Sequence, residues 1–230
     1  MKYFLTFVAV CCIIGTSYGQ LKTPAPSPTQ TLKQEFALSS VELSYSRPAV
    51  KGRKIFGDIV PFGKVWRTGA NRATTITFGE DVSFGGKKVA AGKYGLLTIP
   101  GASEWTIILS KQLDVTSPSA YKEDMDVVRV TAKAVKMPVT MENFTILFDE
   151  IKANSMLLEF IWEKTLVSVP VTAEVDSKVM AQIDTIMQDE KNKSYFSAAV
   201  YYLDNDKDAS KALGWLDKAV AENPDAFYMH

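Results

Sequence analysis

The segment of residues 47–72 carries the side chains of this protein that most readily bind a ligand. Seven of them are cationic, and Asp58 is the only acid among them. A planar guanidinium can hold a carboxylate or phosphate through two hydrogen bonds, and an indole can stack on a sugar or aromatic ring. We therefore predict a site for an anionic or saccharide ligand, and its candidate residues are Arg47, Lys51, Arg53, Lys64, Trp66, Arg67, Asn71 and Arg72.

The same stretch, which reads GKVWRTGANRATTITF over residues 63–78, also fits a purely structural role. Trp66 would then end a strand in the core, Gly69 and Asn71 would form a turn, and ATTITF would return antiparallel. The cations would be solvated or paired with carboxylates in strands, for which the candidates are Glu42, Glu104, Glu159 and Glu163. Buried arginines require such partners. The sequence leaves both interpretations open.

The inventory of reactive side chains excludes several kinds of catalysis. Cys11 and Cys12 lie in an N-terminal apolar run, and His230 is the only histidine. A Ser-His-Asp triad and a zinc site of several imidazoles are therefore excluded. Paired carboxylates remain for hydrolysis, but no pair stands out, because Glu159 and Glu163 would lie about 13 Å apart along a strand. We assign no catalytic residue, no metal ligand and no cofactor.

Two other kinds of site are disfavoured. The segment DNDKD at residues 204–208 resembles the start of a calcium loop, but it lacks the following glycine and the distant glutamate, so a solvated turn between helices is preferred. Nucleic-acid binding is disfavoured because the chain has 26 basic and 26 acidic residues and the basic stretch is local.

The N-terminus, MKYFLTFVAVCCIIGTSYGQ, has the order of a secretory signal peptide: one cation, an apolar run and then small residues. We expect cleavage after Gly19, which makes residues 1–19 a signal peptide and places the mature protein in the periplasm or outside the cell. The apolar run is too short to span a membrane. A lipid anchor on Cys11 or Cys12 is the less favoured alternative, because Val10 stands where a small residue is needed.

Residues 37–173 follow the period of two that is typical of β-strands. For example, Phe144, Ile146 and Phe148 face one side, and the residues between them face the other. Glycine-rich turn signals separate such runs, and short connections of this kind join antiparallel strands. We predict a mainly β domain of about ten strands, either a jelly-roll-like antiparallel β-sandwich or a partly open barrel. Residues 20–36, which include LKTPAPSPTQT, are predicted to be a proline-rich linker.

Beyond residue 173 the hydrophobic spacing becomes helical, which predicts helices from about residue 176, over 194–203 and over 209–222. The segment YFSAAVYYLDNDKDASKALGWLDKAVAENP interleaves alanines with large aromatic residues and resembles a tetratricopeptide helix pair. One such pair cannot bury a repeat core by itself. The appendage over 174–230 is therefore expected to pack on the β part, dimerise or continue further, and it is a candidate surface for a protein partner.

Four motifs are spread between about Pro26 and Val171. They are YSRPAVKGRKIFGDIVPFGKVWRTGANRATTITF, GGKKVAAGKYGLLTIPG, EWTIILSK and FIWEKTLVSVPV. Together they resemble the bacterial family catalogued as domain of unknown function 2911. The resemblance implies an exported protein of Bacteroidetes-type bacteria in which a β domain is followed by tetratricopeptide-like helices. It implies no activity.

These features predict a non-catalytic, exported binding or protein-interaction module of the bacterial envelope. The expected partners are an anionic or saccharide ligand at the basic stretch and a protein at the helical appendage, with no nucleic acid and no membrane span. The alternative is a carbohydrate-active hydrolase that uses two carboxylates.

Overall fold

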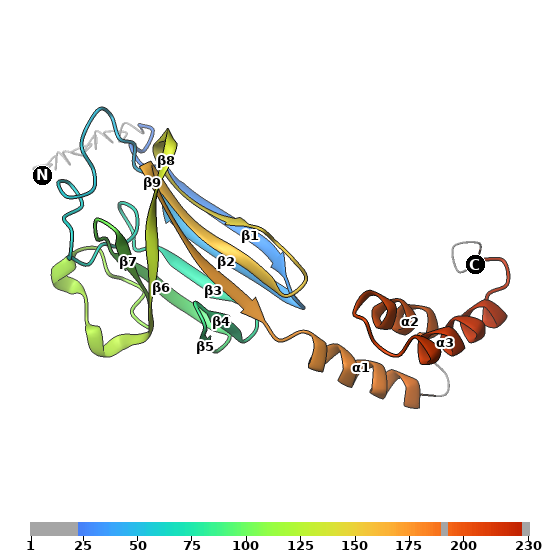
Figure 1. Cartoon of the computed structure of the whole chain (residues 1–230). Helices are drawn as coiled ribbons and strands as arrows, with labels where there is room; N and C mark the ends of the chain where they lie inside the picture. Colours follow the sequence, from blue (N-terminus) through green and yellow to red (C-terminus); the bar gives the residue numbers. More distant parts are fainter. Residues whose placement is uncertain (1–22, 190–192, 227–230) are drawn as a thin grey trace, which may run out of the picture.

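The computed structural model describes residues 23–189 and 193–226, which form a β domain followed by a helical appendage (Figure 1). The expected signal peptide over 1–19 and His230 lie outside the described residues. The predicted fold class is confirmed: the chain is mainly antiparallel β with helices at its C-terminal side, and the sheet is open rather than a closed barrel. In the described part, no helix combines the length and apolar character that a membrane crossing requires.

Nine strands form one sheet in the order β1-β2-β3-β6-β7-β8-β9-β4-β5, and each pairs antiparallel with its neighbours. The strands are β1 (Thr29–Phe36), β2 (Ser39–Ser46), β3 (Thr75–Phe78), β4 (Val82–Phe84), β5 (Lys87–Val89), β6 (Gly92–Ile99), β7 (Glu104–Ser110), β8 (Asp126–Asp149) and β9 (Ser155–Ala173). The predicted linker over 20–36 is too long, because its second half is β1, which pairs with β2 along its whole length.

The sheet bends because β8 changes partner along its length. Its first residues pair with β7, and residues from 134 onward pair with β9. Register shifts interrupt the second ladder between Lys136 and Met141 and again before Thr145, and such bulges bend a strand. A single hydrophobic core then contains side chains from both halves of the sheet, including Leu43 on β2 and Phe160 on β9.

A buried tyrosine ties the two halves together. The hydroxyl of Tyr45 on β2 donates a hydrogen bond to the carbonyl oxygen of Ile146 on β8 at 3.0 Å and accepts one from its amide at 2.9 Å. The Tyr45 ring also meets Phe144 edge-on, with 5.9 Å between ring centroids. Burial raises the pKa of Tyr45, so the hydroxyl keeps the proton that it donates.

The appendage consists of α1 (Asp176–Gln188), α2 (Tyr195–Asp204) and α3 (Ala209–Glu222), with its own small core around Tyr202 and Trp215. An ion pair from Lys178 to Glu80 links α1 to the β domain. The acidic segment at 204–208 connects α2 to α3, and the carboxylate of Asp208 caps α3. No cluster of acidic residues, histidine or cysteine that could hold a metal ion occurs among the described residues.

Gly95 on β6 leaves room for the main chain that follows β7, which passes close to it. A Cβ atom at this position would lie 2.2 Å from the main-chain oxygen of Gln112. We expect Gly95→Ala to lower the free energy of unfolding by about 1–3 kcal/mol, because the backbone must shift to remove this overlap. Urea unfolding followed by tryptophan fluorescence measures the change.

Gly214→Ala is the matched control. Gly214 lies within α3, and a Cβ atom at this position would meet no other atom within 4 Å, so alanine should preserve or raise helix stability by up to about 1 kcal/mol. Equal stability of Gly95→Ala and the parent protein would contradict the close crossing.

Candidate functional site

Residues 67–73 form a loop that leaves the sheet between two neighbouring positions on β6. Before the loop, Trp66 exchanges main-chain hydrogen bonds with Thr98 at 2.7 and 3.0 Å. After it, the carbonyl oxygen of Thr74 accepts from the amide of Leu96 at 2.9 Å. The 67–73 loop is therefore an insertion whose two ends lie side by side on one strand, and it carries Arg67, Asn71 and Arg72 of the predicted site.

Internal hydrogen bonds hold the 67–73 loop in one conformation. Thr68 and Thr74 are fully buried, and the Thr74 hydroxyl donates to the carbonyl oxygen of Thr68 at 2.7 Å. Thr68 has φ +56°, a left-handed conformation that is rare for a β-branched residue. At Gly69, with φ +148°, a Cβ atom would lie 2.9 Å from the main-chain oxygen of Ser46. Because backbone strain of this kind concentrates at binding sites, the loop is a candidate for one.

Three of the four arginines of the predicted site, Arg47, Arg53 and Arg67, bind main-chain oxygens rather than carboxylates. Arg47 donates to the carbonyl oxygen of Phe144 at 3.1 Å, Arg53 to that of Val50 at 2.9 Å, and Arg67 Nη1 to that of Thr116. The interpretation in which these cations pair with strand carboxylates is wrong, since none of the ion pairs among the described residues involves them. Their positive charge thus remains uncompensated by a neighbouring acid.

Three carboxylates on β8 and β9 accept hydrogen bonds from other donors. Glu142 accepts from the amide of Lys51 at 2.8 Å, and Glu163 accepts from the amide of Ile55 at 3.1 Å. These two bonds hold the segment after β2 against β8 and β9. Glu159 instead accepts from the Ser168 hydroxyl, so the pair considered for hydrolysis, Glu159 and Glu163, serves two separate structural contacts.

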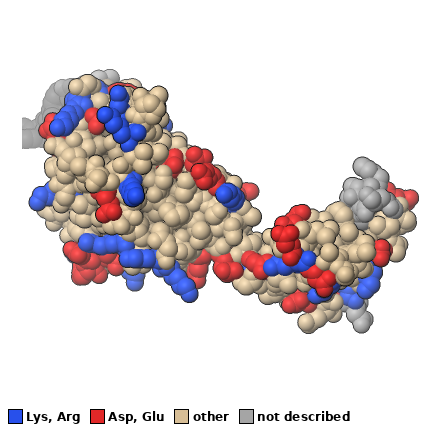
Figure 2. Space-filling model, in the orientation of Figure 1, with Lys and Arg blue, Asp and Glu red and all other residues tan. Residues whose placement is uncertain are grey.

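A cavity of about 510 Å³ opens beside the 67–73 loop, and Arg53, Lys64, Trp66 and Arg67 of the predicted site all line it. We call it the tryptophan cavity. The remainder of its wall is mostly apolar and comes from Pro48, Ile59, Val60, Pro61, Val65, Ala70, Pro118 and Trp162, and it contains no carboxylate. Lys and Arg gather in Figure 2 over the end of the β domain where Figure 1 shows the loop between β2 and β3.

Trp66 is part of a cluster of aromatic rings and not a free stacking platform. Its ring stacks on Trp162 with 5.8 Å between centroids and an interplanar angle of 14°, and it also contacts Phe56, Trp105 and Phe144. These contacts fix the indole in place. The indole nitrogen of Trp66 donates a hydrogen bond to the main-chain oxygen of Gly69 at 3.0 Å. The ring therefore forms a rigid wall of the cavity.

One buried atom of Arg67, a residue that lines the tryptophan cavity, lacks a partner. Arg67 Nε is buried, and no described residue accepts a hydrogen bond from it. An unpaired buried donor costs roughly 1–3 kcal/mol, and more when it is charged. A shift of the Arg67 side chain that brought Nε to an acceptor atom of a ligand in the cavity would remove that cost.

The other predicted residues lie elsewhere. Arg72 lines a neighbouring cavity of about 610 Å³, which we call the hydroxyl cavity because Thr29, Thr31, Ser44, Ser46, Thr75 and Thr116 also line it. Arg47, Lys51 and Asn71 line neither cavity, and Asn71 donates to the main-chain oxygen of Ser27 at 2.9 Å. Trp162 was missed by sequence analysis, since nothing in the motif FIWEKT indicates that it faces Trp66.

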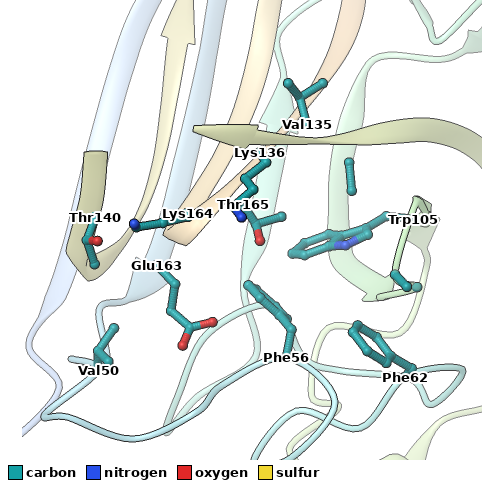
Figure 3. A pocket seen from close by; sticks show the side chains of 13 residues that line it. Val50, Phe56, Phe62, Trp105, Val135, Lys136, Thr140, Glu163, Lys164 and Thr165 are labelled. Carbon is teal, nitrogen blue, oxygen red and sulfur yellow. The ribbon is translucent and has the colours of Figure 1, made fainter. Parts of the chain in front are cut away.

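A third cavity of about 450 Å³ lies at the bend of the sheet, and we call it the corner cavity (Figure 3). Rings of Phe56, Phe62 and Trp105 form one side, and Lys136 and Glu163 are among its polar residues. The Glu163 carboxylate is already bonded to a main-chain amide. No residue of the predicted site lines this cavity, and its mixed charge suits an anion less well than the tryptophan cavity does.

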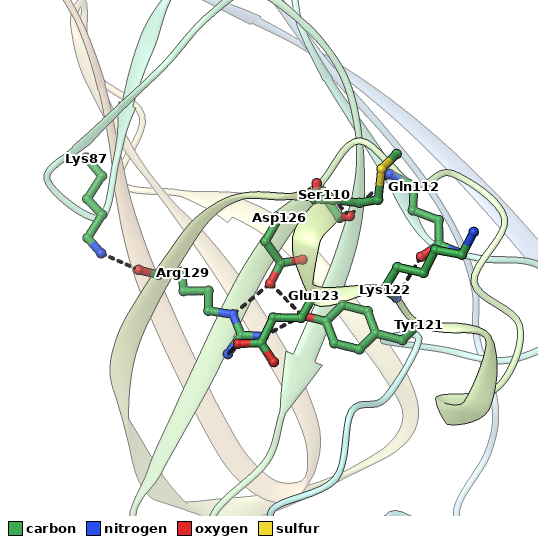
Figure 4. A network of polar contacts seen from close by, with 9 residues as sticks. Lys87, Ser110, Gln112, Tyr121, Lys122, Glu123, Asp126 and Arg129 are labelled. Carbon is green, nitrogen blue, oxygen red and sulfur yellow. Dashed lines mark hydrogen bonds and ion pairs between the residues drawn. The ribbon is translucent and has the colours of Figure 1, made fainter.

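A polar network at the start of β8 serves the fold (Figure 4). Arg129 binds Asp126 at 2.7 Å and Glu123 at 3.1 Å, and its Nη2 donates to the Tyr121 hydroxyl. That hydroxyl donates in turn to Asp126. Burial and the hydrogen bond to Asp126 raise the pKa of Tyr121 to about 12. Lys87 from β5 donates to the carbonyl oxygen of Arg129 at 2.7 Å, so the network joins distant strands.

The raised pKa of Tyr121 predicts an alkaline loss of stability. The unfolded tyrosine titrates near pH 10 and the folded one near pH 12, so the unfolded state loses its proton first and the free energy of unfolding falls between these values. We expect a steeper fall for the parent protein than for Tyr121→Phe, measured by urea unfolding from pH 9 to pH 12. Parallel curves for the two proteins would contradict this assignment.

Comparison with known proteins gives one match. A family model described as a protein of unknown function (DUF2911) matches residues 27–171, which include the 67–73 loop and end before the helical appendage. No curated protein and no solved structure matches the chain.

Proposed function

Because this chain belongs to the DUF2911 family of proteins of unknown function, its family assigns it no activity, and we propose that it is a non-catalytic binding module for an anionic ligand. The observation that carries the proposal is that Arg67, which lines the tryptophan cavity, has a buried donor, Nε, with no partner among the described residues. A carboxylate, phosphate or sulfate group supplies the acceptor that this atom lacks.

The charges around the cavity support an anion. Arg53, Lys64 and Arg67 line it without a carboxylate, and the guanidinium groups of Arg53 and Arg67 are held in place by main-chain oxygens. Cations that are fixed before a ligand arrives lose little conformational entropy on binding. The site is therefore organised in advance for negative charge.

The remaining wall defines the other part of the ligand. The apolar surface of the cavity comes from prolines, from Ile59 and from the rings of Trp66 and Trp162. The Ile59 side chain is 46% exposed. A ligand that combines an anionic group with a ring or apolar body fits both features, as ligand sites commonly pair an apolar wall with a few polar groups. Acidic sugars and their glycosides have this composition.

We place this module outside the cytoplasm, in the bacterial envelope, as its N-terminal sequence and the motifs quoted above suggest. The helical appendage, which resembles a tetratricopeptide pair, would bind a protein partner there. Its own small core and its position beside the β domain leave helix surfaces exposed for that contact, among them Leu203 and Leu213 at 48% and 60% exposure.

The ligand proposal is tested with 4-nitrophenyl β-D-glucuronide and its neutral twin, 4-nitrophenyl β-D-glucoside. We expect the glucuronide to bind and the glucoside to bind at least about tenfold more weakly, and Arg67→Ala to weaken glucuronide binding by a similar factor. Isothermal titration calorimetry measures both. Lys136→Ala removes a cation in the corner cavity and should leave the affinity unchanged.

Equal affinity for the two glycosides, or an Arg67→Ala variant that binds like the parent, would contradict an anion site at Arg67. The same probes address the hydrolase alternative, since cleavage releases coloured nitrophenolate. We expect no release above the buffer rate. Release that is lost in Glu163→Gln or Glu159→Gln would favour the hydrolase instead.

Export is tested by expressing the full chain in a Gram-negative host and measuring, by mass spectrometry, the intact mass of the protein recovered from the periplasm. The expected intact mass corresponds to a chain that begins at Gln20. A cytoplasmic protein that retains residues 1–19, or a lipid-modified product anchored through Cys11 or Cys12, would contradict the proposal.

A further inference from the structure

The hydroxyl cavity lies on the outer face of the sheet formed by β1, β2 and β3. Thr31 on β1 is opposite Ser44 on β2, which is opposite Thr75 on β3, so their side chains share one face. A parallel row pairs Thr29 with Ser46, whose hydroxyl oxygens are 3.1 Å apart. The face is thus a platform of hydroxyl groups, each of which can donate one hydrogen bond and accept two.

Charged side chains of both signs surround this platform. Arg72 and Lys93 supply two cations, and Glu42 and Asp114 supply two carboxylates. None of the four forms an ion pair with another described residue. Carboxylates accept from adjacent hydroxyl groups, and cations bind acidic groups, so the set matches a ligand that is rich in hydroxyls and carries some negative charge.

The hydroxyl cavity adjoins the tryptophan cavity. Three separate chain segments each contribute one residue to each cavity. Ser27, Ala70 and Ser117 line the tryptophan cavity, and Thr29, Arg72 and Thr116, one or two positions away, line the hydroxyl cavity. Hydrogen bonds tie these segments to each other, from Arg67 to Thr116 and from Asn71 to Ser27. These three segments form a wall that the two cavities share.

We infer that the two cavities are adjoining subsites for one acidic oligosaccharide. This inference rests on the proposed function, because the tryptophan cavity binds the acidic unit that Arg67 recognises. The next sugar units cross the wall and lie on the hydroxyl platform, where Ser44 and its neighbours exchange hydrogen bonds with sugar hydroxyls. Arg72 and Lys93 bind the carboxylate of a further acidic unit.

The inference predicts that affinity depends on chain length. We expect tetragalacturonate to bind at least about tenfold more tightly than galacturonate, because the second subsite adds contacts to a ligand that is already held. Arg72→Ala and Lys93→Ala should each remove most of this gain, so that the ratio of the two affinities falls toward one. Lys136→Ala, outside both cavities, should alter neither affinity. Calorimetry in about 0.15 M salt limits non-specific attraction between charges.

Two controls separate this inference from the proposed function and from simple charge attraction. Equal affinities for galacturonate and tetragalacturonate, with binding still lost in Arg67→Ala, would overturn the second subsite and leave the proposed function intact. If the parent protein binds neither galacturonate nor tetragalacturonate, the proposed function is overturned as well. Tetra-aspartate carries as many side-chain carboxylates as tetragalacturonate has carboxylates, but no sugar hydroxyls. If it binds as tightly as tetragalacturonate, the saccharide assignment is overturned. If it binds more weakly, and Ser44→Val also weakens tetragalacturonate binding, the saccharide assignment is supported.

Discussion

Aromatic packing at the bend of the sheet is the contact on which the rest of this structure depends. The cluster comprises Phe56, Trp66, Trp105, Phe144 and Trp162, which come from two loop positions and from β7, β8 and β9, and its rings meet edge-on, tilted or stacked. Such contacts add to the burial of large apolar surfaces. The cluster holds the second half of the sheet over the first, and both the tryptophan cavity and the corner cavity are lined by its rings.

The fold class was predictable from the sequence because buried and exposed faces alternate along the strands. Phe144 and Ile146 of β8 are fully buried, as their period of two indicates, and α3 has the predicted bounds because Asp208 caps its start. The lengths of β8 and β9 were not predictable. Glu163 takes φ +51° inside β9, where it faces a register shift of β8, and the strand continues past it.

The candidate site was predictable only in part, since neighbours in sequence are not neighbours in the fold. Arg53, Lys64, Trp66 and Arg67 line one cavity, and Arg72 faces another. Arg47 is turned toward β8, whose carbonyl at Phe144 lies almost a hundred positions further along the chain. Main-chain acceptors carry no residue signature, so no sequence pattern announces them. The hydroxyl rows in TQT of β1 and SYS of β2 were visible in the sequence, but their shared face required the strand register.

The position of the 67–73 loop has a consequence for how proteins of this fold can diversify. Trp66 and Thr74 occupy neighbouring places on β6, so the ladder continues across the base of the loop. Substitutions at an exposed loop position such as Arg72 leave the register of β3 unchanged, whereas Thr68 and Gly69 are packed against the sheet and tolerate few replacements. Exposed loop residues can thus alter binding preference without disturbing the fold, as hypervariable loops do on other β scaffolds, while the buried residues at the base of the loop keep its position.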